Sequence, residues 1–332
     1  MRQQSLDDTG TPQEVLAKSF ATVRVDKVVD ITFRDAPEAF FVSILAKGGE
    51  LFASYRTTLS SWETVVTKLN HSFAPIVGSE VNIRNTEDAR FVEVDGEGWL
   101  IDNHFLQPRA MTMLDGSKRL VLDTSALGAN FDRGKNWSPF VYKDKLFFVY
   151  SLSPLRVLAC DMPSGKLEWA HVQGRSGDSA LHGSETMNLN GMLKRGGTNG
   201  VVHSGHVYGI GRETKYEAIT CAGVQHQRVA QHYPFLWRFP TRVLDAFLDE
   251  KRVANETTII AVNSTLVVNE DVIEFRQLKH PFQSGVNDPA SMFVHNATLY
   301  MTVSSCSCAC LPEFRNGNAW QRNGVFRLVL QP

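Results

Sequence analysis

Two short apolar, β-rich runs around a tight turn form the commonest pattern along the chain. The clearest case runs from Phe91 to Val94 and from Trp99 to Ile101, on either side of the dipeptide Asp95-Gly96. An Asp-Gly pair between two such runs is a strong hairpin signal, because both residues accept the positive φ that a two-residue turn needs. The pattern therefore predicts a β-hairpin over these residues.

The same layout recurs, so that five comparable units follow one another. Each unit has a small or polar start, a strand, a turn and a second strand that ends in small or polar residues. The other four turns are predicted at Gly48-Gly49, Lys143-Asp144, Ser204-Gly205 and near His295-Asn296. The units start about 50 residues apart early in the chain and further apart later, which is typical of four-stranded propeller blades with insertions.

We therefore predict an all-β protein whose residues 31–332 form one five-bladed β-propeller. Long helices between strands, which a parallel α/β sheet requires, are not evident. Residues 1–30 are assigned to an N-terminal extension with a short helix, because Thr11-Pro12-Gln13-Glu14 has the form of a capping box. An inserted helix is left open within residues 233–252, where helical spacing relates Val243, Leu244, Phe247 and Leu248.

Polar residues at the start of each unit are the candidate functional residues. The innermost strand of every propeller blade starts near the same mouth of the central channel, so these side chains converge there. They are Glu87, Asp88, Arg90, Arg133, Lys135, Asn136, Arg195, Thr198, Asn199, Asn287 and Asp288. The ends of the second strands add rim candidates at Tyr55-Arg56, Asn103-His104 and Arg212-Glu213.

Structural roles are left open for several of these residues. Asp88 and Arg90 are two apart on a strand and share one face, where a structural ion pair alone would explain them. Glu87 and Asp88 face opposite ways, so only one of them addresses the channel. Gly196-Gly197 is interpreted as a tight backbone passage. Ordinary polar or turn roles are assigned to the histidines that lack ligand spacing with a carboxylate, which are His203, His206 and His232.

The charge balance and the apolar content narrow the range of partners. The 332 residues are 43% hydrophobic and 21% charged, with a net charge of −1. No surplus of positive charge is present to attract a polyanion, so nucleic acid and an anionic membrane surface are not expected as partners. No apolar run approaches the roughly 18 residues of a membrane-spanning helix. The first residues also lack the form of a signal peptide.

Cysteines and glycosylation sequons bear on metal binding and on the compartment. The five cysteines, an odd number without zinc-like spacing, are Cys160, Cys221, Cys306, Cys308 and Cys310. For the triplet Cys306, Cys308 and Cys310, packed or surface thiols are expected rather than a metal site or disulfides between neighbours. Five Asn-x-Ser/Thr sequons occur, against roughly two expected by chance, at Asn70, Asn136, Asn255, Asn263 and Asn296. This excess favours a secretory or extracellular location.

Three motifs, in order, resemble those of a known group of proteins. They are NTEDAR followed by a hairpin, GKNWSPFVYKDKLFFVYS, and RGGTNGVVHSGHVYGIG. Together they resemble the five-bladed propellers of glycoside hydrolase family 130 and the related mannosyltransferase/phosphorylase family 108, over roughly residues 35–305. The resemblance implies that Asp88 is the general acid, with Glu87 and Arg90 beside it. It also implies that Lys135 and Asn136 help to bind sugar or phosphate.

The chain departs from the pattern of these families at several positions. Ala89 and Asn199 replace prolines, Gly134 replaces a glutamate, and Ser307 lies where many relatives have a carboxylate. Ordinary glycoside hydrolysis needs two carboxyl groups, so these losses leave Asp88 as the dominant acid. One acid is enough when the nucleophile is already an anion. Phosphate needs only cationic donors, for which the candidates are Arg133, Lys135, Arg195 and Arg212.

We therefore expect a carbohydrate-active enzyme that cleaves or transfers a glycoside in a phosphate-dependent reaction, with Asp88 as its acid. By resemblance the glycoside is a mannoside. Substrate-binding residues are expected at Glu87, Arg90, Asn103, Lys135, Asn136, Thr198, Asn199 and Asp288. The expected partner is a glycan or a small saccharide. No metal or other cofactor is expected, and inorganic phosphate or a sugar phosphate is the co-substrate.

Three alternatives remain open at this point. A hydrolase would need a second carboxylate, from Asp132, Glu213 or Asp288. A nucleotide-sugar transferase would usually contain a metal-binding Asp-x-Asp motif, which the chain lacks. A non-catalytic glycan-binding propeller would keep its aromatic and amide groups but tolerate the loss of Asp88.

Overall fold

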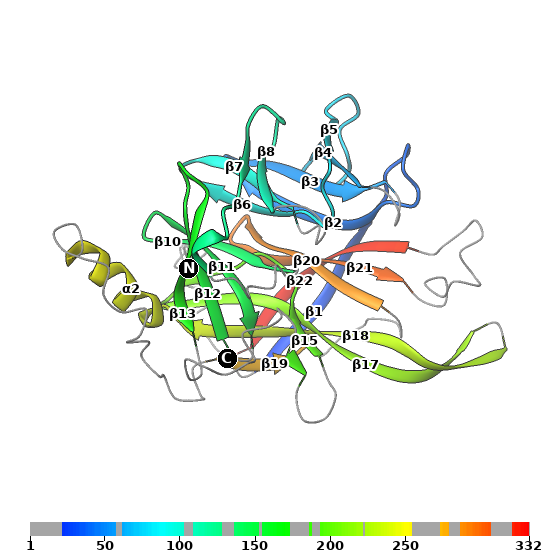
Figure 1. Cartoon of the computed structure of the whole chain (residues 1–332). Helices are drawn as coiled ribbons and strands as arrows, with labels where there is room; N and C mark the ends of the chain where they lie inside the picture. Colours follow the sequence, from blue (N-terminus) through cyan, green and yellow to red (C-terminus); the bar gives the residue numbers. More distant parts are fainter. Residues whose placement is uncertain are drawn as a thin grey trace, which may run out of the picture.

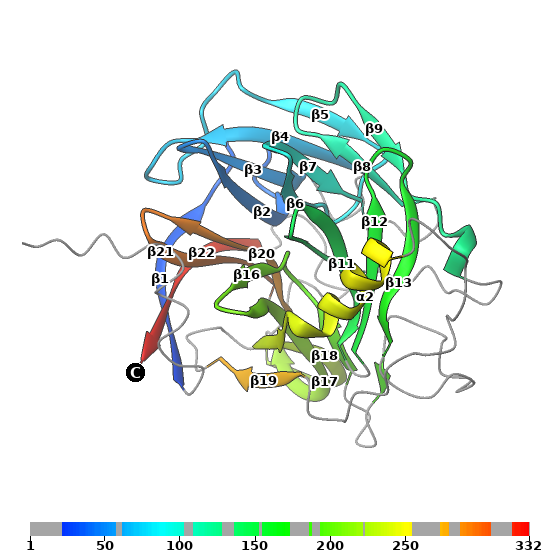
Figure 2. The same ribbon diagram turned by 90° about the vertical axis from the view of Figure 1, so that its left-hand side faces the viewer.

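The chain folds into a ring of five antiparallel sheets. The computed structural model describes residues 22–57, 62–102, 109–127, 136–152, 155–172, 186–187, 193–221, 223–253, 273–278, 286–306 and 321–331. In Figure 2 the sheets follow one another around the ring in chain order. The protein is therefore an all-β, five-bladed β-propeller, as the spacing of its hairpins predicts.

The first three blades each contain four strands in sequence order. Blade 1 consists of β2 (Phe40–Lys47), β3 (Glu50–Arg56), β4 (Glu63–Leu69) and β5 (Val81–Arg84). Blade 2 consists of β6 (Arg90–Val94), β7 (Glu97–Ile101), β8 (Ala110–Met113) and β9 (Arg119–Val121), followed by the short 3-10 helix η1 (Ser125–Leu127). Blade 3 consists of β10 (Ser138–Tyr142), β11 (Lys145–Leu152), β12 (Leu155–Asp161) and β13 (Lys166–Val172). The first strand of each blade lies innermost, because β2, β6 and β10 contact one another around the axis.

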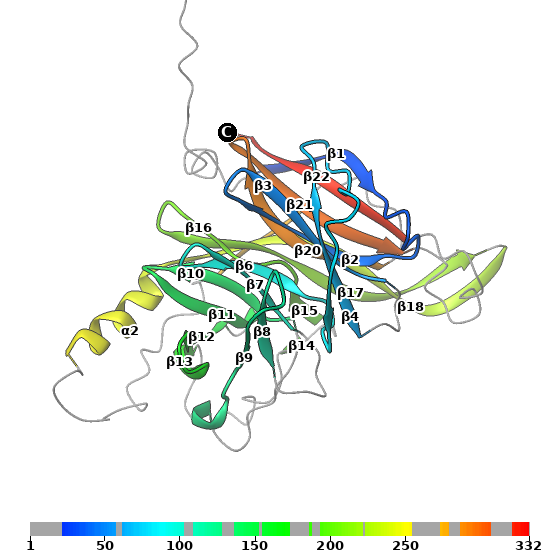
Figure 3. The ribbon, with the colours of Figure 1, turned by 90° about the horizontal axis from the view of Figure 1, so that it is seen from above.

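Blade 4 is a six-stranded sheet. Its strands are β14 (Thr186–Met187), β15 (Leu193–Gly196), β16 (Val201–His203), β17 (His206–Cys221), β18 (Val224–Pro240) and β19 (Glu274–Gln277). Both β15 and β16 pair with β17, so together they form the inner edge of this blade. The long β17–β18 hairpin projects from the ring on the side opposite helix α2 (Arg242–Val253), as Figures 1 and 3 show.

Helix α2 is the insertion that the sequence left open. It begins directly after β18, where Leu244 N–H bonds to the carbonyl oxygen of Thr241 at 2.8 Å. Leu244 is fully buried, and three further apolar residues of the helix pack against the same core, namely Val243, Phe247 and Leu248. These are the four residues whose spacing indicated a helix, so one apolar face explains both the pattern and the packing.

Blade 5 closes the ring with strands from both ends of the chain. Its strands are β20 (Val286–His295), β21 (Thr298–Cys306), β22 (Gln321–Gln331) and β1 (Thr22–Ile31), and β1 pairs antiparallel with β22. Residues 22–30, which the sequence analysis assigned to the N-terminal extension, are thus part of this blade. The helix expected after Thr11 lies outside the described residues. Pairing of β1 with β22 therefore joins the two ends of the propeller within one blade.

All five predicted hairpin turns are present. Each contains two successive residues with positive φ, at Gly48-Gly49, Asp95-Gly96, Lys143-Asp144, Ser204-Gly205 and Asn296-Ala297. Two-residue turns of this kind follow the right-handed twist of their strands. The turn dipeptides in the sequence therefore predicted the positions of the blades correctly.

Apolar side chains fill the spaces between neighbouring blades. One core cluster joins each adjacent pair of blades. The cluster between blades 5 and 1, for example, includes Val325, Ile44 and Leu51. Burial of this apolar surface is the main favourable term in folding. The inner strands are thereby held at fixed positions around the axis.

Candidate functional site

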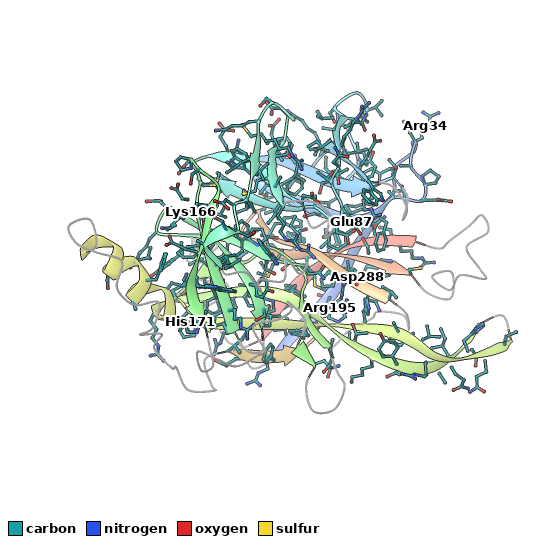
Figure 4. The ribbon with its side chains drawn as sticks, viewed as in Figure 1. Arg34, Glu87, Lys166, His171, Arg195 and Asp288 are labelled. Carbon is teal, nitrogen blue, oxygen red and sulfur yellow. The ribbon has the colours of Figure 1, made fainter. Side chains whose placement is uncertain are left out.

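The starts of the inner strands bring charged residues from four blades together. Figure 4 shows Glu87, Asp288 and Arg195, labelled, in the same region, on the side of the molecule away from α2. The group consists of Arg56, Glu87, Asp88, Arg90, Arg212, His232 and Asp288, and is called the mouth cluster below. The expected convergence of distant polar residues is therefore observed for these members.

Backbone strain marks the same end of three blades. Phe41, Asp88 and Asn136 have φ values of 55°, 47° and 69° and lie at or just before the inner strands of blades 1, 2 and 3. Asp and Asn tolerate this left-handed conformation, but it is unfavourable for a bulky residue such as phenylalanine. Strained residues of this kind cluster at functional sites, where the surrounding structure holds them in place.

The carboxylate of Asp88 is held by a buried arginine from the neighbouring blade. Arg56, at the end of β3, donates from Nη1 to Asp88 Oδ1 at 2.9 Å and to Glu87 Oε1 at 3.4 Å. The side chains of Asp88 and Glu87 are 15% and 18% exposed, whereas that of Arg56 is 6% exposed. Charge-assisted bonds to this buried guanidinium fix both carboxylates at the surface of the mouth.

Arg90 has a different position from the one expected of a substrate-binding residue. Its side chain is fully buried and lies over the ring of Phe41, 4.9 Å from its centroid. It donates to the backbone carbonyl of Gly197, to Asp88 O at 3.2 Å and to Asn136 Oδ1 at 3.2 Å. Burial lowers the pKa of Arg90 to about 9, although Asp88 opposes this effect. Arg90 therefore links blades 2, 3 and 4, and interacts electrostatically with both halves of the mouth cluster.

The glycine pair of blade 4 is a tight backbone passage, as the sequence indicated. A Cβ atom on Gly196 would lie 2.4 Å from Asn136 O, and one on Gly197 would lie 2.6 Å from both Ile210 O and Pro289 Cγ. Side chains are excluded because backbone from blades 3 and 5 approaches on both sides. The passage brings the carbonyl of Gly197 within reach of Arg90.

Thr198 and Asn199, both expected to bind substrate, make internal contacts. Thr198 is fully buried, and its hydroxyl accepts a hydrogen bond from Ile210 N at 3.0 Å. Asn199 uses both ends of its amide on Met292 of blade 5, since Nδ2 donates to Met292 O at 2.9 Å and Oδ1 accepts from Met292 N at 3.0 Å. These side chains join blades 4 and 5 next to the mouth.

The second half of the mouth cluster is centred on Asp288, at the start of β20. Arg212 Nη1 and His232 Nδ1 both lie 2.6 Å from Asp288 Oδ1. Burial by itself raises the pKa of Asp288, but the charges of Arg212 and Arg90 and the interaction with His232 outweigh it, so the pKa lies below its usual value. Asp288 is therefore a carboxylate anion at neutral pH, shared by an arginine and a histidine.

Backbone contacts fix the position of His232 on β18. Asn287 Nδ2 donates to the carbonyl of His232 at 3.3 Å, and Asn287 Oδ1 accepts from Ser305 Oγ at 2.8 Å. No local sequence signal points to His232, because its partner Asp288 is 56 residues away. The interpretation of His232 as an ordinary polar residue missed this contact.

Buried polar groups continue behind Glu87. The backbone N–H of Glu87 donates to Asp102 Oδ1 at 3.1 Å, and Arg109 donates to Asp102 O at 3.0 Å. The guanidinium of Arg109 lies over the Trp137 ring at 4.3 Å, a distance at which a cation and an aromatic face attract. Asp102 and Arg109, which the sequence reasoning did not single out, thus support the loop that carries Glu87.

The remaining candidates differ in how far the structure describes them. Arg195 is partly buried and lies opposite Arg212 in the β15–β17 pairing. Asn136 is 3% exposed and engaged with Arg90. Asn103, Arg133 and Lys135 lie outside the described residues. Asp88 and Arg90 share a hydrogen bond through the Asp88 backbone, while the carboxylate of Asp88 bonds to Arg56.

The described residues contain no group of three or more His, Cys, Asp or Glu residues that could hold a metal ion. Among the helices in this part of the chain, none has the length and apolar character needed to cross a membrane.

The expectation of thiols is wrong for Cys306, which is disulfide-bonded. Cys160 is a buried free cysteine, and burial raises its pKa to about 12.

Comparison with known proteins finds similarity in three dimensions. No family model and no curated protein sequence matches the chain. A mannose phosphorylase from Leishmania mexicana, MPT-4, solved with phosphate, is 13% identical, covers 92% of this chain and 88% of its own, and has a TM-score of 0.48. The arabinanase Arb43A from Bacillus subtilis is 9% identical, with 87% and 93% covered and a TM-score of 0.46. MPT-1, a GDP-Man-dependent mannosyltransferase from Leishmania mexicana, is 8% identical, with 95% and 92% covered and a TM-score of 0.45.

These values carry no functional argument, because the identities and TM-scores are low. The molecule is thus a five-bladed propeller with a buried ionic cluster at one mouth.

Proposed function

We propose that this protein is a carbohydrate-active enzyme that cleaves or forms a glycosidic bond at the mouth cluster, with Asp88 as general acid. The observation that carries the proposal is the position of the Asp88 carboxylate, 15% exposed and 2.9 Å from Arg56. It combines a fixed location at the mouth with access from solvent. The left-handed backbone at Asp88 supports the same role, because strain of this kind is common where a catalytic side chain must be aimed.

The motif around Asp88 supports a sugar as substrate. Glu87, Asp88 and Arg90 match three positions of the motif that the resemblance to glycoside hydrolase family 130 rests on. Glu87 is 18% exposed beside Asp88 and is suited to accept hydrogen bonds from sugar hydroxyls. On this basis the substrate is a glycan or a small saccharide, and by resemblance a mannoside.

Inorganic phosphate or a sugar phosphate is the co-substrate that we propose. Arg195 lies directly across from Arg212 on paired strands, and like charges in that arrangement repel unless an anion lies between them. Both arginines are assigned to phosphate, and Arg212 shares its charge with Asp288 at 2.6 Å. Arg133 and Lys135 are further candidates from the sequence. Phosphate then attacks the anomeric carbon while Asp88 protonates the leaving oxygen.

Turnover of an Asp88→Asn variant tests this proposal. Phosphate consumption and sugar phosphate release are measured with manno-oligosaccharides, with and without inorganic phosphate. Loss of a general acid typically lowers the rate by about 10²–10⁴-fold, and the variant should lose turnover by that amount. Asn keeps the size of Asp, so the thermal unfolding of the variant should remain cooperative. Wild-type-like turnover in the variant would refute the role of Asp88.

We also propose a secretory or extracellular location. Disulfides persist mainly in oxidising compartments, and Cys306 is disulfide-bonded. Asn70 and Asn296 are exposed sequon asparagines, whereas Asn136 is 3% exposed and is too buried to accept a glycan. Expression in a eukaryotic secretory host should therefore give a mobility shift on deglycosylation that a double Asn70→Gln, Asn296→Gln variant reduces. Absence of any shift counts against this location.

A further inference from the structure

His232 and Asp288 form a histidine–carboxylate pair, and Arg90 interacts electrostatically with both Asp288 and the proposed acid, Asp88. Nδ1 of His232 lies 2.6 Å from Asp288 Oδ1. Because Asp288 is an anion, it accepts from this nitrogen, and Nδ1 carries the hydrogen. In the neutral imidazole the second nitrogen, Nε2, then has a free lone pair. An acidic residue that orients a histidine in this way makes its second nitrogen a proton acceptor.

The environment of His232 suits such a role. Its side chain is 12% exposed, and Nε2 makes no hydrogen bond within the part of the chain that is described. Asn287 holds the backbone of His232, and Arg212 holds Asp288 on the same oxygen. The imidazole is thereby fixed in orientation while one nitrogen stays accessible from the mouth.

We propose that His232 is a general base that activates water, so that the mouth cluster also hydrolyses glycosides without phosphate. This inference rests on the proposed function, because it needs the sugar bound beside Asp88. It supplies the second group that hydrolysis requires, in place of the missing second carboxylate. Asp288 is a positioning residue here, because it acts on the reaction through His232, whose Nδ1 it holds with the same oxygen that bonds to Arg212.

The step balances in protons and electrons. The water oxygen forms a bond to the anomeric carbon as Nε2 of His232 takes one water proton. The bond between that carbon and the leaving oxygen breaks, and the leaving oxygen takes the proton of the Asp88 carboxyl group. The products are the free sugar and the alcohol. His232 then returns its proton to solvent and Asp88 regains one.

The test uses aryl glycosides with an activated leaving group, which need no acid to assist departure. A panel of 2,4-dinitrophenyl hexosides and pentosides, with the mannoside first, is hydrolysed in phosphate-free buffer and in buffer with inorganic phosphate. The readout is the ratio of hydrolysis to phosphorolysis. In His232→Ala this ratio should fall by about 10²-fold or more, the usual contribution of a general base. Added imidazole should restore hydrolysis in this variant, an effect that a merely structural role would not produce.

Two further variants serve as controls. His206→Ala removes a histidine at the other end of blade 4, where its Nδ1 lies 3.1 Å from Ser204 O, and should leave the ratio unchanged. His232→Gln keeps a side chain of similar reach, for use if the alanine variant does not fold, and should also lose hydrolysis.

The outcomes separate this inference from the proposed function. A fall in the ratio with imidazole rescue supports the base role. Phosphate-dependent turnover with no hydrolysis, or with hydrolysis that survives both His232 variants, overturns the base role and leaves the proposed function standing. If the wild type turns over no glycoside in either buffer, the proposed function fails and the base role fails with it.

Discussion

Two arginine–aspartate pairs at the same mouth have the same chemistry and different surroundings. Arg56 bonds to Asp88 at 2.9 Å, and Arg212 bonds to Asp288 at 2.6 Å. Asp88 shares its arginine with Glu87, whereas Asp288 shares its own carboxylate oxygen with His232. The two pairs therefore differ in the third residue of each group, which is Glu87 in one and His232 in the other. One pair presents two neighbouring carboxylates, and the other presents an oriented imidazole.

Arg90 interacts electrostatically with both pairs. Fully buried, it interacts with the charges of Asp88, Asp288 and Arg212, yet it donates hydrogen bonds to backbone or amide oxygens of Gly197, Asp88 and Asn136. This fixed positive charge helps to lower the pKa of Asp288. A buried arginine therefore organises both halves of the site through backbone and amide oxygens.

The same substitution in both pairs should give the largest contrast. Asp288→Asn leaves the buried Arg212 without its carboxylate, and breaking a buried pair by removing one partner costs about 3–5 kcal/mol. Asp88→Asn should cost only about 1–2 kcal/mol, because Arg56 keeps a second carboxylate, that of Glu87 at 3.4 Å. Urea unfolding at constant slope measures both values. Equal costs would show that the two pairs are structurally equivalent.

Gly197→Ala tests the backbone passage that connects the two halves. Its Cβ would meet Ile210 O and Pro289 Cγ, each at 2.6 Å, and overpacking of this kind costs about 1–3 kcal/mol. Turnover should also fall, because the Gly197 carbonyl that Arg90 uses would shift. Gly205→Ala is the matched control, since Gly205 has a φ of 73° with open space around its Cα. It should lose stability through backbone strain but keep its turnover.

The fold was accessible from sequence because its signals are local. Turns such as Asp95-Gly96 and Lys143-Asp144 require positive φ at two adjacent residues. The residue types that accept this conformation can be recognised in the sequence from the turn dipeptide alone. The glycine pair Gly196-Gly197 likewise indicated, from its residue types alone, a place where another part of the backbone approaches closely. Once the five blades are recognised, the sequence also predicts where the inner strand of each blade starts.

The chemistry of the mouth was only partly accessible, because its contacts join distant positions. Arg56 and Asp88 are 32 residues apart, and His232 and Asp288 are 56 apart. No spacing rule relates such pairs, since the blades that carry them vary in length. For the same reason sequence could not separate Arg90, which is buried, from the exposed residues beside it.

Acid should reduce the difference between wild type and Asp288→Asn. The folded-state pKa of Asp288 lies below its ordinary value, because Arg212, His232 and Arg90 outweigh the effect of burial. Its contribution to stability is thus complete above the unfolded pKa of about 4 and is lost progressively as the pH falls from there through the lower folded-state pKa. Urea midpoints measured from pH 7 to pH 3 should therefore differ by a constant amount down to about pH 4 and by a shrinking amount below it. A gap that stays constant from pH 7 to pH 3 contradicts the assignment.

The smallest expected effect decides which of two adjacent carboxylates is the acid. Glu87 lies 3.4 Å from Arg56 and is 18% exposed, so Glu87→Gln should lower stability by less than about 1 kcal/mol. If Glu87 binds sugar hydroxyls, KM should rise several-fold while kcat changes little, because an amide still forms hydrogen bonds but with altered polarity. Asp88→Asn should instead lower kcat. If Glu87→Gln abolishes kcat and Asp88→Asn does not, the acid is Glu87, and Arg56 is then the residue that holds Asp88 in a supporting role.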